Sequence, residues 1–396
     1  MDHLSTIIQE NAIRIFNDGD ASAEDVIAAL IADGQIDDAP VFVVDVGCVK
    51  RAYDRWRERL PRVTPHYAVK CNSDPVVVQV LAALGSSFDV ASYNEISAVL
   101  EHAPPERLIF AHPIKNSKTI SYARAVDVDL LTFDSSNELL KVALYHPNAE
   151  LLLRLKVDDT GSACRFSTKF GADSEDVPQL LALARTLGLN VTGVSFHVGS
   201  GCVDAQLYAA AIEHALATIE TARAVGMDLA TVDIGGGFQS DTFDAFAAVI
   251  RPYVERLPQL KFIAEPGRLF VSDAATLVIS VIGKKRVVRD GKVTFVIYAN
   301  ESVYGMFNNL LFDHQTVKLE PFNEREGELY TTKVYGRTCD SIDVIAEECL
   351  LPDLAVGERL FVRRMGAYTK ASAASSFNGF EVPKTVYVLT TTPEDH

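Results

Sequence analysis

The stretch Ala230-Thr-Val-Asp-Ile-Gly-Gly-Gly237 is a short run rich in β-forming residues that ends in three glycines. Apolar residues at helical spacing precede it over 205–225 and follow it over 243–257, and another short apolar run occupies 262–265. Short strands joined by helices of this length are typical of parallel β-α-β units. The stretch therefore predicts a parallel sheet in which at least one strand ends in a glycine-rich turn.

The same alternation of strand and helix extends in both directions from this stretch. Eight strand candidates alternate with helical segments over about 220 residues, which is the count and length of a (β/α)8 barrel. Functional residues of such barrels lie at the carboxyl ends of the strands. The predicted strands are 66–70, 88–92, 108–112, 129–133, 151–156, 193–198, 230–234 and 262–265.

The residues on either side of the barrel follow other patterns. The N-terminal residues, including 13–16, have helical spacing with a break at 18–20, whereas the C-terminal part consists of short β runs. The expected organisation is a helical segment over 1–40, a strand over 41–46 that joins the β domain, a barrel over 47–270, and an all-β, Greek-key-like domain over 271–396.

The composition is that of a globular chain with an acidic surface. Of the 396 residues 48% are hydrophobic, which is enough to form a large core, and 53 acidic against 37 basic residues give a net charge of −16. Such a charge repels phosphate backbones and anionic lipids, so nucleic acid and membrane are not expected as partners.

Six cysteines are present, but no Cys/His spacing matches a zinc site, so we predict free thiols and no metal. The N-terminal residues do not have the pattern of a secretory signal, and no apolar run approaches the length of a membrane span. These observations predict a cytoplasmic protein.

Lys70 ends an otherwise apolar and aromatic strand. A lysine at this place is either a solvated residue of the barrel rim or a partly desolvated amine that can form an imine. The residues at the ends of the other strands must decide between these interpretations.

The glycines Gly235, Gly236 and Gly237 follow the seventh predicted strand. Without Cβ atoms their backbone N–H groups can converge on an anion, and phosphate sites of these barrels lie after strands seven and eight. Gly267 and Arg268 follow strand eight, and Ser200 follows strand six, which adds a cation and a hydroxyl. Together these residues predict a site for a monophosphate.

Glu265 and His197 complete the pattern at the strand ends. Glu265 either pairs with Arg268 or holds a proton on the nitrogen of a pyridine ring, and His197 is either a core histidine or a ring that stacks on a flat cofactor. A lysine, an acidic group, a phosphate site and an imidazole at one barrel mouth indicate pyridoxal 5′-phosphate.

Seven motifs, in order along the chain, resemble those of the ornithine decarboxylase family, whose barrel and β domain have the architecture of alanine racemase. They run from about residue 40 to 390 and are Tyr67-Ala-Val-Lys70-Cys-Asn, Phe88-Asp-Val-Ala-Ser, Phe196-His-Val-Gly-Ser-Gly, Asp233-Ile-Gly-Gly-Gly-Phe, Ala264-Glu-Pro-Gly-Arg, Thr338-Cys-Asp and Gly366-Ala-Tyr-Thr.

The resemblance implies a role for each matching residue. Lys70 would bind the cofactor covalently, Glu265 would pair with its ring nitrogen, and His197 would stack on its ring. Asp89 and Arg154 would line its inner edge, and the phosphate would be held by Ser200, Gly235, Gly236, Gly237, Gly267, Arg268 and Tyr368.

The resemblance also implies a homodimer whose active sites are shared between the subunits. Cys339 and Asp340 would come from the partner subunit, and Cys339 would return a proton to the α-carbon after carbon dioxide leaves. Tyr304 and Phe377 would join Glu301 and Asp340 around the tail of the substrate. The implied reaction is the decarboxylation of a basic amino acid.

Two departures from the family pattern concern the substrate. Glu301 and Ser302 stand where the family usually has aspartate and glycine, and Arg337 stands where it generally has proline. A glutamate at 301 is similar to an arginine-decarboxylating branch, because a carboxylate can bind a guanidinium through two hydrogen bonds. Arg337 either repels a basic substrate or pairs with Glu301 or Asp343.

L-Ornithine is therefore the expected substrate, with L-arginine as the alternative and L-lysine or another diamino acid after it. Diaminopimelate would need a cation for its second carboxylate, which only Arg337 offers, and an alanine racemase would usually have arginine in place of Glu265. A non-catalytic regulator similar to the antizyme inhibitors is the remaining alternative, although Lys70 and Cys339 are both present.

Overall fold

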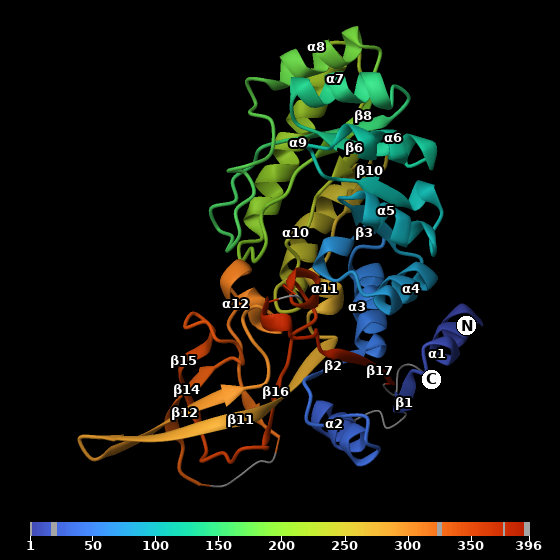
Figure 1. Ribbon diagram of the computed structural model, residues 1–396. Helices are drawn as coiled ribbons and strands as arrows, with labels where there is room; N and C mark the ends of the chain where they lie inside the picture. Colours follow the sequence, from blue (N-terminus) through green and yellow to red (C-terminus); the bar gives the residue numbers. More distant parts are fainter. Residues whose placement is uncertain (1, 17–21, 323–326, 375–376, 392–396) are drawn as a thin grey trace. The chain divides into compact units, whose positions relative to one another are not determined.

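The computed structural model describes residues 2–16, 22–322, 327–374 and 377–391 (Figure 1). The chain divides into two units, Lys50–Phe270 and a unit that combines Met1–Val49 with Val271–His396. Within the described residues no helix is long and apolar enough to cross a membrane, and no group of three or more His, Cys, Asp and Glu side chains is arranged to hold a metal ion.

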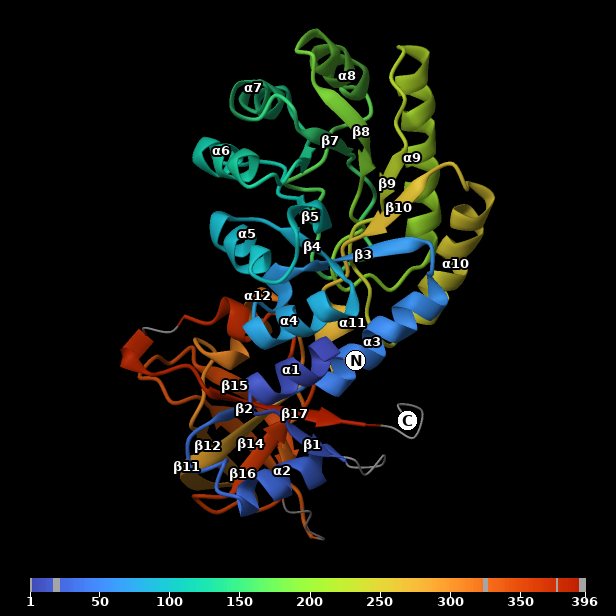
Figure 2. The same cartoon turned by 90° about the vertical axis from the view of Figure 1, so that its right-hand side faces the viewer.

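The unit Lys50–Phe270 is a closed barrel of parallel strands, which confirms the predicted (β/α)8 class. Figure 2 shows the helices around the outside of the strands. The strand order around the barrel is β10 (Lys261–Ala264), β3 (Val63–Ala68), β4 (Ser87–Val90), β5 (Leu108–Phe110), β6 (Leu130–Phe133), β7 (Glu150–Arg154), β8 (Asn190–Ser195) and β9 (Thr231–Asp233).

The helices between these strands follow the chain order of a barrel. They are α3 (Val46–Arg59), η1 (Val69–Cys71), α4 (Pro75–Leu84), α5 (Tyr93–Leu100), η2 (Pro105–Arg107), α6 (Ser117–Ala125), α7 (Ser136–Tyr145), α8 (Val177–Thr186), α9 (Gln206–Ala224), α10 (Phe243–Arg256) and α11 (Arg268–Val271).

Local sequence signals explain where helix α4 begins and ends. The Asp74 side chain accepts a hydrogen bond from the N–H of Val76, and Pro75 occupies the first helical position, where no N–H is needed. Gly85 then ends the helix at a φ of +96°, a conformation that glycine adopts without strain.

The barrel is filled by apolar side chains, and aromatic rings attach α3 to it. Ile109, Leu152 and Ile263, from three different strands, form one fully buried cluster. Trp56 of α3 is also fully buried, stacks on Phe243 at 5.3 Å between ring centroids, and donates its indole N–H to the carbonyl of Val63.

The second unit is built on a mixed sheet. Its strand order is β1 (Arg14–Phe16), β17 (Lys384–Thr390), β2 (Val41–Asp45), β11 (Ala275–Arg289), β12 (Lys292–Ala299), β14 (Tyr330–Tyr335) and β15 (Val344–Leu351), and β16 (Arg359–Val362) joins β11 to β13 (Glu320–Pro321). The helices are α1 (Asp2–Glu10), α2 (Ala23–Ala32), η3 (Met306–Asn308), α12 (Asn309–Phe312), η4 (Lys370–Ser372) and η5 (Phe377–Gly379).

Strand β2 lies inside this sheet because its partners come from the far end of the chain. It pairs antiparallel with β11 and parallel with β17, and Val41 faces Lys384 in the register. Val41–Val44 are all buried, and Ile27 and Leu30 of α2 pack into the same core cluster as Val41.

Several predicted strands have other bounds in the structure: β8, for example, ends at Ser195, so His197 follows it, although it was predicted inside a strand over 193–198. Two further differences concern residues 14–16 and Lys70. Residues 14–16, predicted as helix, form β1, because they pair with Val388–Thr390 of β17; the predicted break at 18–20 lies outside the described residues. Lys70, predicted as the end of a strand, lies in the 3-10 turn η1, since Ala68 bonds to the carbonyl of Pro266 and the chain turns after it.

Candidate active site

Lys70 and Asp89 meet at the carboxyl ends of two neighbouring barrel strands. Strands β3 and β4 pair Ala68 with Asp89, and the turn η1 then directs Lys70 Nζ onto the carboxylate of Asp89, where the two form an ion pair. The Asp89 side chain is 1% exposed and that of Lys70 is 42% exposed. The amine is thus held by a buried anion while its side chain still faces open space.

Asp233 and Glu265 form a carboxyl pair at the ends of β9 and β10. Asp233 is fully buried, and its Oδ1 accepts the N–H of Gly235 at 2.9 Å. Burial, together with the charge of Asp89, raises the pKa of Asp233 to about 7. Burial raises the pKa of Glu265 well above its usual value, and the charges of Asp233 and Asp89 add to this effect. The pair therefore retains a proton near neutral pH.

Arg154, at the end of β7, provides positive charge next to these carboxyl groups. Its charge opposes the rise in the pKa of both Asp233 and Glu265. Its guanidinium lies over the ring of Phe170 at 5.1 Å from the centroid. Arg154 thus belongs to the same electrostatic cluster as the carboxyl pair.

The glycines after β9 allow backbone to pack against backbone. The N–H of Glu265 donates to the carbonyl of Gly235, and the Tyr208 hydroxyl donates to that of Gly236. A Cβ on Gly236 would lie 2.7 Å from the Glu265 carbonyl oxygen and 2.9 Å from His197 Nε2, and Gly237 has a φ of +106°. Side chains at these positions would fill the space beside His197 and Glu265.

His197 is a neutral, half-buried imidazole. Burial, with the charges of Arg154 and Lys70, lowers its pKa well below 6.5. Its Nδ1 accepts the N–H of Gly199 at 2.9 Å, which leaves the proton on Nε2. The ring also contacts Phe166 edge to face at 4.8 Å between centroids.

Arg268 and Ser200 lie together after strands β10 and β8. Arg268 Nη2 donates to Ser200 Oγ at 3.1 Å, and both side chains are buried. Gly267, the residue before Arg268, packs against Cys71, and a Cβ there would lie 2.9 Å from Cys71 Cβ. A cation and a hydroxyl therefore lie together at the barrel mouth, and Gly237 lies beside Gly199, the residue before Ser200. A cation and a hydroxyl beside a glycine-rich turn suit a phosphate.

The remaining predicted residues lie in loops of the sheet unit. Tyr304 donates to Asp340 Oδ2 at 2.5 Å and stacks on Phe377 with 3.9 Å between ring centroids. Cys339 is exposed, so it does not have the ordinary structural role of a cysteine as a small buried apolar side chain. Tyr368 is half-buried and holds a φ of +54°, a conformation unusual for a tyrosine.

The sequence motifs do not identify two further functional candidates: Asp233, a carboxylate at a strand end next to the glycines, and Asp343. Asp343 is 1% exposed and accepts N–H groups from Val303 and Thr338 at 2.9 Å each. It therefore connects the loop of Glu301 to the loop of Cys339. Asp343 lies two residues after a Thr-Cys-Asp-Ser run, and no sequence pattern around it indicates this role.

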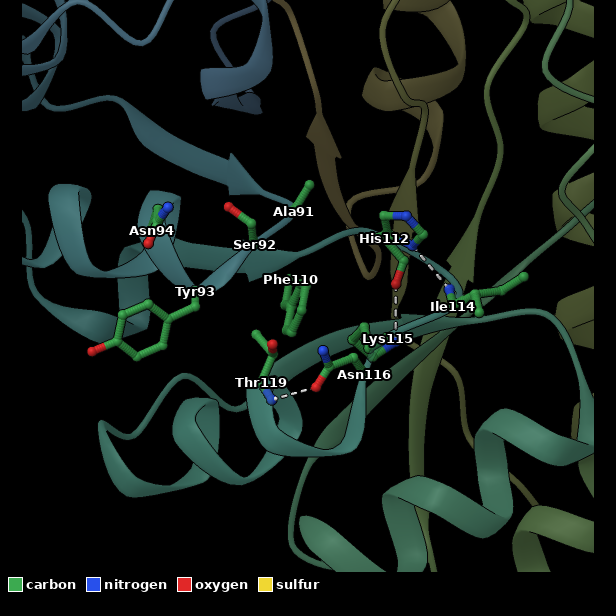
Figure 3. A pocket seen from close by; sticks show the side chains of 10 residues that line it. All are labelled: Ala91, Ser92, Tyr93, Asn94, Phe110, His112, Ile114, Lys115, Asn116 and Thr119. Atoms are coloured by element: carbon green, nitrogen blue, oxygen red, sulfur yellow. Dashed lines mark hydrogen bonds between the residues drawn. The ribbon is translucent and has the colours of Figure 1, made fainter.

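A separate pocket of about 360 Å³ lies next to the ends of β4 and β5. Figure 3 shows the side chains that line it. Lys115 lies beneath it, fully buried, and donates to the carbonyl of His112 while pairing with Glu138 at 2.9 Å. None of the predicted site residues lines it. The lining residues are Ala91, Ser92, Tyr93, Asn94, Phe110, His112, Ile114, Lys115, Asn116 and Thr119.

Comparison with known proteins agrees with this chemistry. Residues 46–272 match the family model described as pyridoxal-dependent decarboxylase, pyridoxal binding domain. Ornithine decarboxylase of Mus pahari is 41% identical over 392 residues, covering 93% of this chain and 85% of that protein. Antizyme inhibitor 2 of Xenopus laevis is also 41% identical, over 404 residues, covering 96% and 88%.

Solved structures of decarboxylases have the same fold. Arginine decarboxylase of Paramecium bursaria Chlorella virus superposes with a TM-score of 0.88 at 35% identity, covering 92% of this chain and 100% of that one. Lysine/ornithine decarboxylase of Vibrio vulnificus, complexed with cadaverine, gives 0.84 at 36% identity, covering 92% and 99%. The chain belongs to the family of pyridoxal-dependent decarboxylases that includes ornithine decarboxylase.

Proposed function

We propose that the protein decarboxylates a basic L-amino acid with the help of pyridoxal 5′-phosphate, and that L-ornithine is its main substrate. The observation that carries the proposal is the set of groups at the barrel mouth: an amine held by a buried carboxylate, a carboxyl pair that retains a proton, and a buried arginine bonded to a hydroxyl. These groups match the aldehyde, ring nitrogen and phosphate of the cofactor.

Each residue of the barrel mouth has a proposed task. Lys70 would hold the cofactor through its Nζ, and Asp89, which pairs with that amine, would keep it in position. Glu265 would offer a proton to the ring nitrogen, and the flat, neutral imidazole of His197 would contact the ring. Arg268, Ser200, Gly235, Gly236, Gly237 and Gly267 would hold the phosphate.

When bound, pyridoxal phosphate supplies an electron sink for the electron pair that carbon dioxide leaves behind. Cys339, an exposed thiol, then delivers a proton to the α-carbon in the partner subunit of a homodimer. Asp340 of the same loop offers a carboxylate to the distal cation of the substrate.

Arginine is the second candidate substrate, and Glu301 is the observation that favours it. A viral arginine decarboxylase is among the most similar solved structures. The regulator alternative is represented by the similar antizyme inhibitor 2. This chain retains Lys70, Glu265 and Cys339, which supports an enzyme.

Carbon dioxide release from ornithine, arginine, lysine and diaminopimelate, measured with added cofactor, tests the proposal. Lys70→Ala should abolish both this release and the visible absorbance of the bound cofactor, because the amine that binds it is lost. Lys118→Ala, which removes an exposed lysine of helix α6, is the matched control and should leave both unchanged. A colourless wild-type protein that releases no carbon dioxide would favour the regulator instead.

A further inference from the structure

Cys339, the residue proposed to return a proton to the α-carbon, lies in the loop 336–343 between strands β14 and β15. The residue is exposed, so packing within its own chain does not fix the thiol. A proton donor must come within hydrogen-bond reach of the atom that accepts the proton, and a misplacement of about 1 Å can cost about 100-fold in rate. The hydrogen bonds of the loop must therefore place the thiol.

Asp343 holds the residue that precedes the thiol. Its Oδ2 accepts the backbone N–H of Thr338 at 2.9 Å and the hydroxyl of the same residue at 2.7 Å. The Oγ1 of Thr338 in turn accepts the N–H of Asp340 at 3.4 Å. These bonds hold the backbone on either side of Cys339, but they do not reach Cys339 itself.

Asn378 holds Cys339 directly. Its side-chain Oδ1 accepts the backbone N–H of Cys339 at 3.2 Å. Asn378 lies in the turn η5 with a φ of 52° and a ψ of 11°, a left-handed conformation that asparagine adopts more readily than most residues, and Gly379 follows with a φ of +73°. The residue thus combines an acceptor for Cys339 with tolerance of the turn that carries it.

A second contact joins the segment 377–381 to the same loop at another point. Arg337 Nη2 donates to the carbonyl of Glu381 at 2.9 Å, and the Arg337 side chain is only 12% exposed. This contact does not involve the side chain of Asn378. Loss of that side chain should therefore leave the loop attached and loosen the backbone at Cys339.

We propose that Asn378 is a positioning residue that acts through Cys339, because its side-chain oxygen fixes the backbone of the residue that delivers the proton. In that delivery the Sγ–H bond breaks, a C–H bond forms at the α-carbon with the electron pair that carbon dioxide leaves behind, and the thiolate regains a proton from water. This inference rests on the proposed function. It assigns Asn378 to the proton transfer and not to the loss of carbon dioxide that precedes it.

The test is an acid-quenched single turnover of the holoenzyme with ornithine, in which carbon dioxide and product amine are measured separately. Asn378→Gly keeps the left-handed backbone and removes the acceptor, whereas Asn378→Asp keeps an oxygen acceptor. Asn378→Gly should lengthen the lag between carbon dioxide release and amine formation by about fivefold, which corresponds to the net strength of about 1 kcal/mol of one hydrogen bond. Carbon dioxide release itself should keep its rate.

Asn378→Asp should show at most half the lag of Asn378→Gly, because the acceptor is restored. Asp290→Gly is the matched control: Asp290 is likewise exposed, has a φ of +49° and precedes a glycine, in the turn between β11 and β12. It should leave both rates unchanged. If Asn378→Gly does not fold, Asn378→Ala also lacks the acceptor and should give the same longer lag.

Three results would overturn the inference. They are a lag in the folded glycine or alanine variant within twofold of the wild type, an aspartate variant with a lag as long as that of the glycine variant, and an equal slowing of carbon dioxide release and amine formation. The last result would mean that Asn378 only supports the general structure of the site.

Failure of the inference differs from failure of the proposed function. A wild-type holoenzyme that releases no carbon dioxide from any basic amino acid would refute the proposed function and the inference with it, whereas an active wild type with an unchanged lag in the variants would refute the inference alone. Hydrogen exchange of the Cys339 N–H, measured without substrate, should be faster in Asn378→Gly than in the wild type. An unchanged exchange rate would overturn the inference as well.

Discussion

Replacing Gly236 by alanine should weaken the binding of pyridoxal phosphate, because the new methyl group has no space. Its Cβ would lie 2.7 Å from the carbonyl oxygen of Glu265 and 2.9 Å from Nε2 of His197. Both distances are shorter than carbon contacts allow, so the imidazole or the backbone of Glu265 must move. Gly236 does not have a positive φ, and the effect is therefore steric and not conformational.

The size of the effect follows from the cost of such overpacking. One inserted methyl group that forces its neighbours to shift costs about 1–3 kcal/mol. If the shift falls on His197 and Glu265, the groups proposed to contact the cofactor ring, the dissociation constant should rise by about 5- to 150-fold. The carbonyl of Gly236, which accepts the Tyr208 hydroxyl, adds a buried contact that resists any backbone movement.

The assay is a titration of cofactor-free protein with pyridoxal phosphate, followed by visible absorbance. Gly188→Ala is the matched control, because a Cβ there meets nothing within 4 Å, although its φ of +70° will lower stability somewhat. Thermal unfolding of both variants separates a loss of stability from a loss of affinity. A dissociation constant of Gly236→Ala within threefold of the wild type would refute the steric reasoning.

Two further predictions concern the carboxyl pair and the barrel core. Burial raises the pKa of Asp233 to about 7, above the value of about 3.9 for an unfolded chain, so the free energy of unfolding should fall as the pH rises from 4 to 7. Asp233→Asn removes this titration, and its urea midpoint relative to the wild type should rise between pH 5 and pH 7 in cofactor-free protein; parallel pH profiles would contradict the assignment. Trp56→Ala should lower the free energy of unfolding by about 3–5 kcal/mol, since a fully buried indole and its hydrogen bond to Val63 are lost. Circular dichroism checks this, with the smaller change Trp56→Phe as control, and equal losses in both variants would mean that the hydrogen bond and not the packing dominates.

The barrel could be predicted from sequence because each of its strands is a local apolar run next to a helix. For example, the strand predicted over 129–133 is β6, Leu130–Phe133, in the structure. The residues near each end of a barrel strand are enough to locate where it begins and ends. Residues 14–16 could not be predicted as a strand, because their partner β17 lies at the other end of the chain. Local spacing contains no information about such a pairing.

The candidate site likewise contains some residues that local sequence identifies and others whose roles only the fold determines. Lys70, Glu265 and Arg268 were recognisable because strand ends and glycines mark them in the sequence. The ion pair of Arg337 with Glu301 was one of several alternatives, and only the fold of the two loops selects it over Asp343, which instead binds backbone N–H groups. Asp233 was missed because its effect on Glu265 depends on the burial of both carboxyl groups.

The pairing of β2 with β11 and β17 has a consequence for the order of assembly during synthesis. Residues 50–270 are continuous and can close their barrel as soon as they have left the ribosome, whereas β2, made earlier, must wait for the last strand. Until Lys384–Thr390 appear, the apolar residues 41–44 lack one of their neighbours and offer an open strand edge. A truncated chain without β17 would therefore leave an edge of β2, one of the first strands to be made, without its partner. Such chains should be prone to aggregate through this open edge.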